Sequence, residues 1–388
     1  MFDDEPIRAW LAELREQVPG IDLFDVHTHI GQNDPDEFKC LAGELKESLA
    51  GVGARGVVFP MHEPDGYPAA NDMIIEEGAR SEGRLIPFCR LDPRADPLGE
   101  AERALGRGAA GIKLHPRAEG FALDSPALAD VFALAHERRL PVLVHAGRGI
   151  PALGRHALEI CGRYPGVRLI LAHAGICDLA WIWSAAADQP NLFFDTAWWS
   201  ASDLLALYAL VPPCHILFAS DAPYATPALA AFMNLRYALQ AGLSQEAVRL
   251  IFGGQIDRIL SGMEAADAGA APGPGSLDRD PLLDREHTFL VTALGQMLTG
   301  LEAAEALGLA ALACEVGDGA PQAEVCSTVL GILELRERHV AAGVYDDRPA
   351  RFAPGSPMVV LAACVARTPG VRMPSVAEPT IDVGERAA

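Results

Sequence analysis

Short apolar segments recur along the first 220 residues of this chain, at intervals of roughly 25 to 35 residues. Eight such segments are typical of buried strands: 23–31, 56–60, 85–89, 111–115, 141–145, 167–173, 191–195 and 215–221. Helical periodicity occupies the intervals, for example 41–49, 127–139 and 152–164. Apolar strands that alternate with helices indicate a parallel sheet covered by helices, and eight such units predict a (β/α)8 barrel. The alternative, an open doubly wound sheet, usually carries a Gly-rich phosphate loop after its first strand, and none is present here.

The rest of the chain divides by composition. A helix over 5–19 precedes the first strand and helices near 226–241 and 244–260 complete the predicted barrel domain, which spans residues 1–263. An Ala/Gly/Pro/Asp-rich stretch over 264–281 predicts a flexible linker. Residues 282–366 predict an α-helical C-terminal domain of unknown role, with helices over 287–307, 309–316 and 323–342 and a break at Gly308. The Pro-rich segment 367–388 is predicted to be a poorly ordered tail.

The charge balance narrows the range of partners. The formal net charge of −21 disfavours binding to nucleic acid or to anionic membranes, which leaves a small-molecule substrate as the expected partner. Eight dispersed cysteines without a C-x-x-C pair are typical of reduced, buried thiols. With an acidic N-terminus and no long uncharged apolar stretch, a cytoplasmic protein is expected. The sequence leaves open whether the chain forms a homo-oligomer.

Ionisable side chains follow the predicted strands at their carboxyl ends, where barrels carry their catalytic groups. They are His27, His29, Lys113, His115, His145, His173 and Asp221. Side chains alternate along a strand, so His27 and His29 point the same way, roughly 7 Å apart, and can share one metal ion. Taken singly, each histidine could be a hydrogen-bonded core residue and Asp221 a helix cap. Together they indicate a metal site, and nitrogen and carboxylate ligands suit Zn²⁺ first, with Mn²⁺ or Fe²⁺ next.

Five short motifs carry a family resemblance. They are Asp25-Val26-His27-Thr28-His29, Gly111-Ile112-Lys113-Leu114-His115-Pro116, Val144-His145-Ala146-Gly147, Ala172-His173-Ala174-Gly175 and Ser220-Asp221-Ala222-Pro223. In this order, over residues 22–260, the chain resembles the amidohydrolase superfamily, and most of all its amidohydrolase-related branch of metal-dependent hydrolases, decarboxylases and hydratases. Gln255 departs from the Asn expected in the closing helix, at a position that is more structural than catalytic. Beyond residue 280 the resemblance covers nothing.

The resemblance implies a role for each motif residue. His27, His29, His145 and Asp221 would be metal ligands, and His173 either a ligand or the group that polarises the substrate. Asp221 would act as general base towards a metal-activated water, and Asp25 would be a supporting group. Lys113 would hold a substrate carboxylate or, carboxylated, bridge two metal ions. A lysine that merely extends from the barrel mouth is the structural alternative.

Further side chains at the predicted barrel mouth suggest an anionic substrate. Arg90, Arg117 and Arg148 follow the third, fourth and fifth strands, and guanidinium groups suit carboxylates. His115 and Trp198 are further candidates for the pocket. The structural alternatives are that the three arginines are ordinary loop residues and that Trp198 packs against a helix.

The function expected first is metal-dependent hydrolysis of an amide, lactone or ester bond in a small anionic substrate. The first alternative is a non-oxidative decarboxylase or hydratase of a carboxylic acid. The second is a non-catalytic barrel that presents the C-terminal helices as an interaction module.

Overall fold

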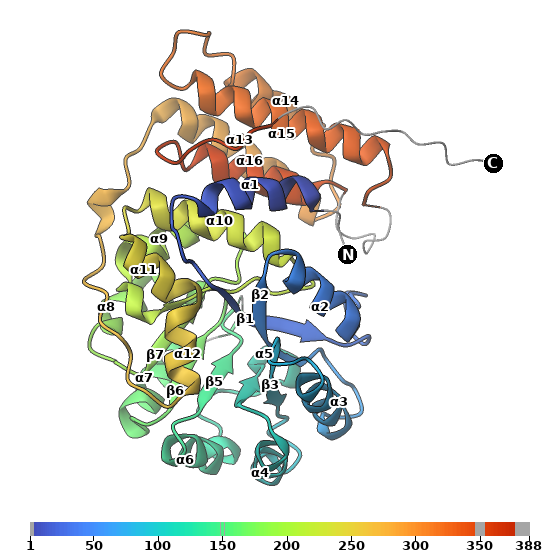
Figure 1. The fold of residues 1–388 in the computed structure, drawn as a ribbon, viewed down its shortest axis with the longest axis vertical. Coiled ribbons are helices and arrows are strands. Elements are labelled where there is room, and N and C mark those ends of the chain that lie inside the picture. The colour runs from blue at the N-terminus through green and yellow to red at the C-terminus, as the bar shows by residue number, and fades with distance from the viewer. Residues whose placement is uncertain (1–3, 148, 151, 346–353, 377–388) are drawn as a thin grey trace, which may run out of the picture.

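The computed structural model describes residues 4–147, 149–150, 152–345 and 354–376, and its centre is a parallel eight-stranded sheet (Figure 1). The strands neighbour one another in chain order from β1 to β8, which confirms the predicted barrel fold. Their bounds are β1 Leu23–Ile30, β2 Ala54–Pro60, β3 Leu85–Arg90, β4 Gly111–Leu114, β5 Pro141–Val144, β6 Arg168–Leu171, β7 Leu192–Asp195 and β8 Ile216–Leu217.

The barrel closes where the last strand meets the first. The backbone N–H of Val26 donates to the carbonyl of Phe218 over 3.0 Å, and that of His29 donates to Ala222 over 2.8 Å. β8 is shorter than the predicted 215–221 because the N–H of Phe218 turns to the carbonyl of Ile251 instead of a strand neighbour. Ile251 belongs to a π-helical turn, Leu250–Gly254, which thereby packs against the end of β8 next to the seam.

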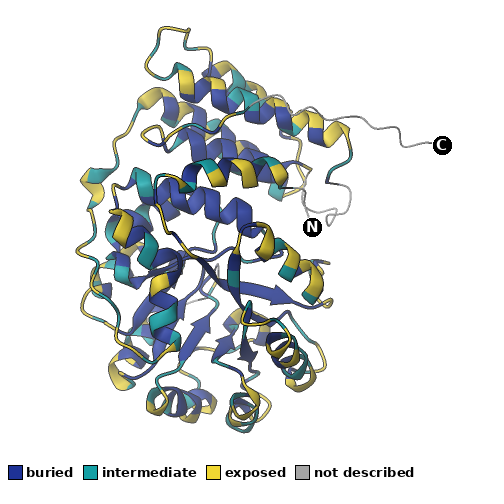
Figure 2. Cartoon of the chain, in the orientation of Figure 1, coloured by how far each residue is buried: buried dark blue, intermediate teal, exposed yellow. Residues whose placement is uncertain are grey.

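Helices cover the outside of the sheet, and their inward faces are buried while their outward faces are exposed (Figure 2). Local signals set where they begin: Ser200 caps α9, and Thr226 caps α10 just before Pro227 in its first turn. The helices of this part of the chain are α1 Glu5–Arg15, α2 Ala42–Gly51, α3 Pro68–Ala79, α4 Pro97–Arg107, α5 Pro116–Glu119, α6 Ala129–Glu137, α7 Leu153–Arg163, α8 Leu179–Ala186, α9 Ala201–Leu210, α10 Pro227–Gln240, α11 Gln245–Arg249 and α12 Gln255–Leu260.

Gln255, the residue that departs from the family pattern, is fully buried and holds two segments together. Its side-chain amide donates to the carbonyl of Cys214 over 2.7 Å, and its amide oxygen accepts from the N–H of Ala266. The amide therefore serves packing between the end of the barrel and the segment that follows it.

Four further helices lie beyond α1 and α10: α13 Pro281–Leu298, α14 Ala304–Ala313, α15 Ala323–Ala341 and α16 Ser356–Ala366 (Figure 1). The predicted break at Gly308 is wrong, because Gly308 lies inside α14. The chain breaks instead after Thr299, where Gly300 takes a φ of +72° and ends α13 as a left-handed glycine does. The boundaries at residues 264, 282 and 367 stay predictions.

Residues 367–376, the first part of the segment predicted to be a tail, pack against the barrel helices. The buried guanidinium of Arg236 on α10 donates to the hydroxyl of Thr368 over 2.8 Å and to the carbonyl of Arg372 over 2.7 Å. The indole N–H of Trp10 on α1 donates to the carbonyl of Ser375. Residues 377–388 lie outside the described residues.

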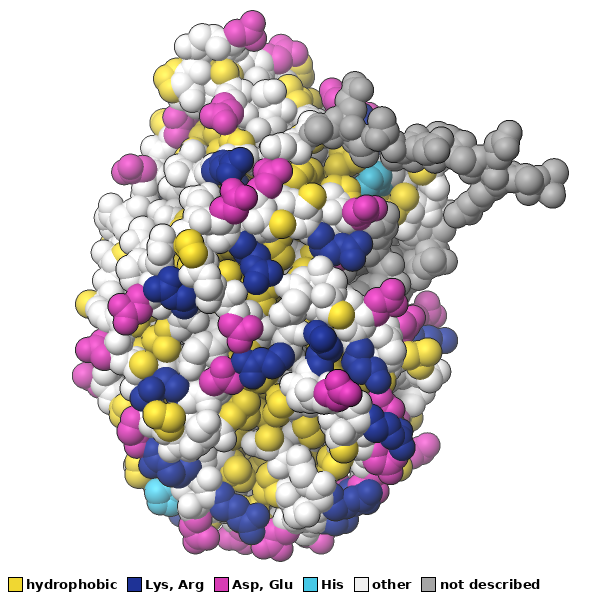
Figure 3. Space-filling view, viewed as in Figure 1, with side chains coloured by type: hydrophobic (Ala, Val, Ile, Leu, Met, Phe, Trp, Pro, Cys, Tyr) yellow, Lys and Arg dark blue, Asp and Glu magenta, His cyan; other side chains and the backbone are white. Residues whose placement is uncertain are grey.

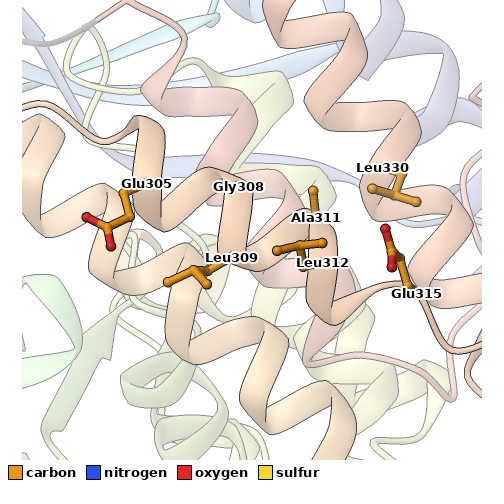
Figure 4. Close-up of a pocket in the computed structure, with 7 residues that line it drawn as sticks. All are labelled: Glu305, Gly308, Leu309, Ala311, Leu312, Glu315 and Leu330. Carbon is orange, nitrogen blue, oxygen red and sulfur yellow. The ribbon is translucent and has the colours of Figure 1, made fainter.

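Two surface features follow from this arrangement. Charged side chains of both signs are interspersed over the face shown in Figure 3, with apolar side chains between them. A hollow of about 530 Å³ lies on α14 and α15, lined among others by Glu305, Leu309, Glu315 and Leu330 (Figure 4). Within the described residues, no helix has the length and apolar character needed to cross a membrane.

Candidate metal centre

Two histidines of β1 and one aspartate after β8 converge on a single point. Oδ1 of Asp221 lies 3.2 Å from Nε2 of His27 and 3.1 Å from Nε2 of His29. Both imidazoles are buried, whereas the Asp221 side chain is 21% exposed, so the group opens to solvent on the aspartate side. The three ligand atoms lie within 4.8 Å of one another, a spacing that one divalent ion can bridge.

Asp195, at the end of β7, fixes the protonation of His27. Its Oδ2 lies 2.8 Å from Nδ1 of His27, and a carboxylate only accepts, so Nδ1 carries the proton and donates it. Nε2 then presents its lone pair towards Asp221. A carboxylate behind a histidine in this way orients the ring and raises its strength as a metal ligand.

A second chain of imidazoles runs beside the first group. The carbonyl of Ala197 accepts from Nδ1–H of His173 over 2.6 Å, which leaves Nε2 of a neutral His173 to accept from Nδ1–H of His145 over 2.9 Å. Nε2 of His145 is then an acceptor, and it is buried with no hydrogen-bond partner in the described part of the chain. His115 stacks on His145 with ring centroids 3.9 Å apart.

Lys113, on β4, brings a cation into the same buried space. Its Nζ lies 3.3 Å from Nε2 of His27 and 4.3 Å from the centre of the Phe59 ring. Burial lowers the pKa of Lys113 to about 7, and the neighbouring Asp221 opposes that shift. With little solvent to stabilise the ammonium, Lys113 exchanges between the charged and neutral forms near neutral pH, and a bound anion would favour the charged form.

Burial dominates the electrostatics of the whole group. It lowers the pKa of His27 and His29 well below the usual value and raises the pKa of Asp221 well above it. Both histidines are therefore neutral near pH 7, and neutral imidazole is the form that binds metal. Two imidazole lone pairs and one carboxylate oxygen within reach of one another fit a divalent ion. His145 and His173 lie outside this group of three and contact each other instead.

Asp25 connects the two segments that carry the candidate metal ligands. Its Oδ1 accepts from the backbone N–H of His27 over 3.1 Å and from that of Ser220 over 3.0 Å. These bonds tie β1 to the segment that carries Asp221. Burial raises the pKa of Asp25 to about 7, although its hydrogen bonds with Ser220 and His27 oppose the shift.

The predicted substrate residues fall in different places. Arg90 is buried in an ion pair with Glu119, whose Oε1 lies 2.6 Å from its Nη2, and Arg117 is exposed on α5. Nδ1 of His115, the N-cap residue of α5, accepts from the N–H of Ala118. Trp198 stands edge-on to His173 at 6.1 Å and donates its indole N–H to Asp203. Arg148 lies outside the described residues.

Two residues with a role near the site, Asp195 and Glu119, were not predicted from the sequence. Asp195 ends β7 after an apolar run, the same signal that singled out His145 and His173, so the rule applied to them could have found it. Glu119 gave no such signal, because its partner Arg90 is 29 residues away in the chain.

The fold and the histidine–aspartate group define a (β/α)8 barrel with a candidate divalent-metal site at the carboxyl ends of its strands. The amidohydrolase-2 family model, described as amidohydrolase, matches residues 24–260, and the chain belongs to this family. No curated protein matches the chain.

Solved structures show the same fold at low identity. An amidohydrolase II is 19% identical, with a TM-score of 0.50 over 62% of this chain and 100% of that chain. A 5-carboxyvanillate decarboxylase from Sphingomonas paucimobilis is 15% identical, with a TM-score of 0.50 over 62% of this chain and 99% of that chain. A dihydroxybenzoic acid decarboxylase from a Polaromonas species, with bound manganese and the inhibitor 2-nitroresorcinol, is 15% identical, with a TM-score of 0.50 over 62% and 97%.

Proposed function

We propose that this amidohydrolase is a metal-dependent lyase that removes or adds a small group on a carboxylic acid, with non-oxidative decarboxylation as the first candidate. The observation that carries the proposal is the position of Lys113, whose Nζ stands 3.3 Å from the ligand nitrogen of His27. A cation next to a divalent-metal site is suited to hold a substrate carboxylate. Two of the structural neighbours are decarboxylases of aromatic acids, which supports the same reaction class.

His27, His29 and Asp221 would hold the ion, with His145 and its unpartnered Nε2 as a further candidate ligand. A bound divalent ion would supply positive charge that polarises an oxygen of the substrate. The manganese in one neighbour makes Mn²⁺ a candidate beside the Zn²⁺ expected from the ligand types.

The chain's own residues would divide the remaining work. Lys113 would bind one carboxylate oxygen, and the ring of Phe59 beneath it keeps water from the ammonium. Both ring nitrogens of His173 are engaged, Nδ1 with the carbonyl of Ala197 and Nε2 with His145, so His173 would hold His145 in position rather than bind the substrate. Trp198, edge-on to His173, would contact the ring or carbon chain of the substrate.

Asp221 is placed to carry the proton. Its Oδ1 faces the two ligand histidines, and its Oδ2 lies 4.0 Å from Nδ1 of His173, on the other side of the carboxyl group. In decarboxylation the carbon–carbon bond to the carboxylate breaks and carbon dioxide leaves. The electron pair then takes a proton from Asp221, which recovers one from solvent through its exposed side.

Hydrolysis is the second candidate, and the amidohydrolase family match favours it. In that reaction Asp221 would instead take a proton from an attacking water and return it to the leaving group. A carboxylated Lys113 that bridges two ions would belong with this alternative, because it could no longer act as a cation.

Product analysis separates the two reactions. Protein stripped with a chelator and reloaded with Mn²⁺ or Zn²⁺ is incubated with aromatic and unsaturated carboxylic acids, and in parallel with amides, esters and lactones. The proposal expects release of carbon dioxide, or uptake of water into a double bond, only in the metal-loaded protein. The variant His29→Ala should lose this activity, whereas His156→Ala, at a histidine of α7 outside the site, should keep it. Cleavage of amides or esters alone would establish hydrolysis, and failure to bind either metal would leave the non-catalytic barrel.

A further inference from the structure

A second cluster of metal-binding side chains lies in the C-terminal helices, outside the barrel. Glu286 comes from α13, Cys314 ends α14 and Cys326 comes from α15. One carboxylate oxygen and the two sulfur atoms lie within 4.8 Å of one another, and all three residues are buried. Segments that are 40 residues apart in the chain thus bring two thiols and one carboxyl group to a single point.

The carboxyl group of Glu286 has few partners for a fully buried acid. Its Oε2 lies 3.5 Å from Sγ of Cys326, a weak donor, and its Oε1 has no hydrogen-bond partner among the described residues. Burial raises the pKa of Glu286 to about 7 and the pKa of Cys326 to about 12. An acid in such a place costs stability unless it is paired, so its presence needs an explanation beyond packing.

We propose that Glu286, Cys314 and Cys326 bind a zinc ion that joins α13, α14 and α15. Two thiolates and a carboxylate are established ligand types for zinc. In a tetrahedral site with zinc–sulfur bonds of about 2.3 Å, the two sulfur atoms stand about 3.8 Å apart, within the spacing found here. Both thiol protons leave for solvent when the ion binds, and the fourth position is left for a water molecule.

This site differs from the barrel site in the softness of its ligands. The barrel group offers only nitrogen and oxygen, whereas this cluster offers sulfur, which favours Zn²⁺ over Mn²⁺. The hollow on α14 and α15 involves chain neighbours of two of the ligands. It is lined by Glu315, which follows Cys314, and by Leu330, one helical turn after Cys326 (Figure 4).

Cobalt reports on this cluster selectively. Wild-type protein is reduced, stripped with a chelator and titrated with Co²⁺, and the near-ultraviolet charge-transfer absorption from thiolate to cobalt is recorded. The barrel ligands carry no sulfur, so they contribute nothing to this band. We expect one thiolate-bound Co²⁺ per chain, displaced by Zn²⁺ and unaffected by His29→Ala.

Matched substitutions test which residues produce the thiolate-to-cobalt absorption band. Cys314→Ser and Cys326→Ser should each remove it, and Glu286→Gln should weaken Co²⁺ binding. Cys364→Ser, the same change at a buried free cysteine of α16, should leave the band intact. The wild-type titration alone decides the matter if a variant fails to fold. Absence of the band from fully reduced wild-type protein overturns the proposal, as does a band that survives both cysteine substitutions. A Cys314–Cys326 disulfide in protein isolated without reductant, with no Co²⁺ binding after its reduction, overturns it as well.

Discussion

Nζ of Lys113 and Nε2 of His27 stand 3.3 Å apart in a space where both side chains are fully enclosed. An ammonium so close to a ligand nitrogen belongs to the same chemical site as the ligands, although it comes from the fourth strand and not the first. The role of Lys113 in substrate binding can therefore be tested separately from metal binding.

Replacing the ammonium should weaken substrate binding while leaving the metal in place. A charged hydrogen bond contributes about 1.5–3 kcal/mol, so we expect Lys113→Met to lower kcat/KM for a carboxylate substrate by about 10- to 100-fold. The expected loss is mainly in KM, and elemental analysis should find the same number of ions per chain in both proteins. Loss of an ion in the variant would instead indicate that a carboxylated Lys113 bridges two metals.

The carboxylate behind His27 should matter for metal affinity. Asp195→Asn removes the acceptor that fixes the Nδ1 proton of His27, and a change of this kind typically costs about 10- to 100-fold in affinity for the ion. Competition with a fluorescent chelator measures the change. Asp188→Asn, the same substitution at an exposed aspartate before β7, should leave affinity unchanged, and equal affinities for all three proteins would contradict the role assigned to Asp195.

The buried pair of Arg90 and Glu119 should stabilise the fold. Glu119→Ala leaves the guanidinium enclosed without its partner, and we expect the free energy of unfolding to fall by about 3–5 kcal/mol. In contrast, Asp92→Ala in the exposed pair with Arg94 should change it by less than about 1 kcal/mol. Denaturant titration compares the two.

A double variant separates stability from substrate binding at Arg90. Arg90→Met combined with Glu119→Leu replaces both charges with apolar groups and should recover most of the lost stability. If this stable protein keeps its kcat/KM, Arg90 does not hold the substrate. If it loses kcat/KM, the role predicted from the sequence is the better account.

His215 should make the fold sensitive to acid. Burial lowers the pKa of His215, while its hydrogen bond to the carbonyl of Leu192 opposes the shift. The unfolded chain, with a pKa near 6.5, therefore binds a proton that the folded chain resists, and stability falls as the pH drops below about 6.5. The slope from one such group is at most about 1.4 kcal/mol per pH unit. His215→Asn retains a donor near the position of Nδ1 and should show a shallower decline in urea titrations from pH 7 to 5. Equal slopes would show that His215 is protonated alike in both states.

The sequence predicted the scaffold well because barrel strands are nearly continuous apolar runs, and seven of these runs lie within a residue or two of a strand in the structure. The eighth is shorter than predicted because Phe218 bonds to Ile251, which no local pattern signals. The meeting of His27, His29 and Asp221 was foreseeable, since strand ends gather at one rim of a barrel.

Pairings between distant side chains were harder to foresee. Arg90 looks the same in sequence whether it faces a substrate or Glu119, and only the fold decides. In the same way Cys314 and Cys326 are two of eight scattered cysteines until the helices bring them to Glu286. The break between the C-terminal helices was predicted at the wrong glycine, because the residue type does not show which glycine takes a positive φ: Gly300 does, and Gly308 lies inside α14.

The bonds from Arg236 to Thr368 and Arg372 also set an order of events during synthesis. During synthesis α10 is made more than a hundred residues before the segment that accepts the hydrogen bonds of this buried guanidinium. Until that segment is made, water is the partner of the Arg236 guanidinium, so α10 cannot be enclosed as it is in the finished fold. A chain cut short within the C-terminal helices would therefore leave α10, a helix of the barrel domain, without the partners of its buried cation.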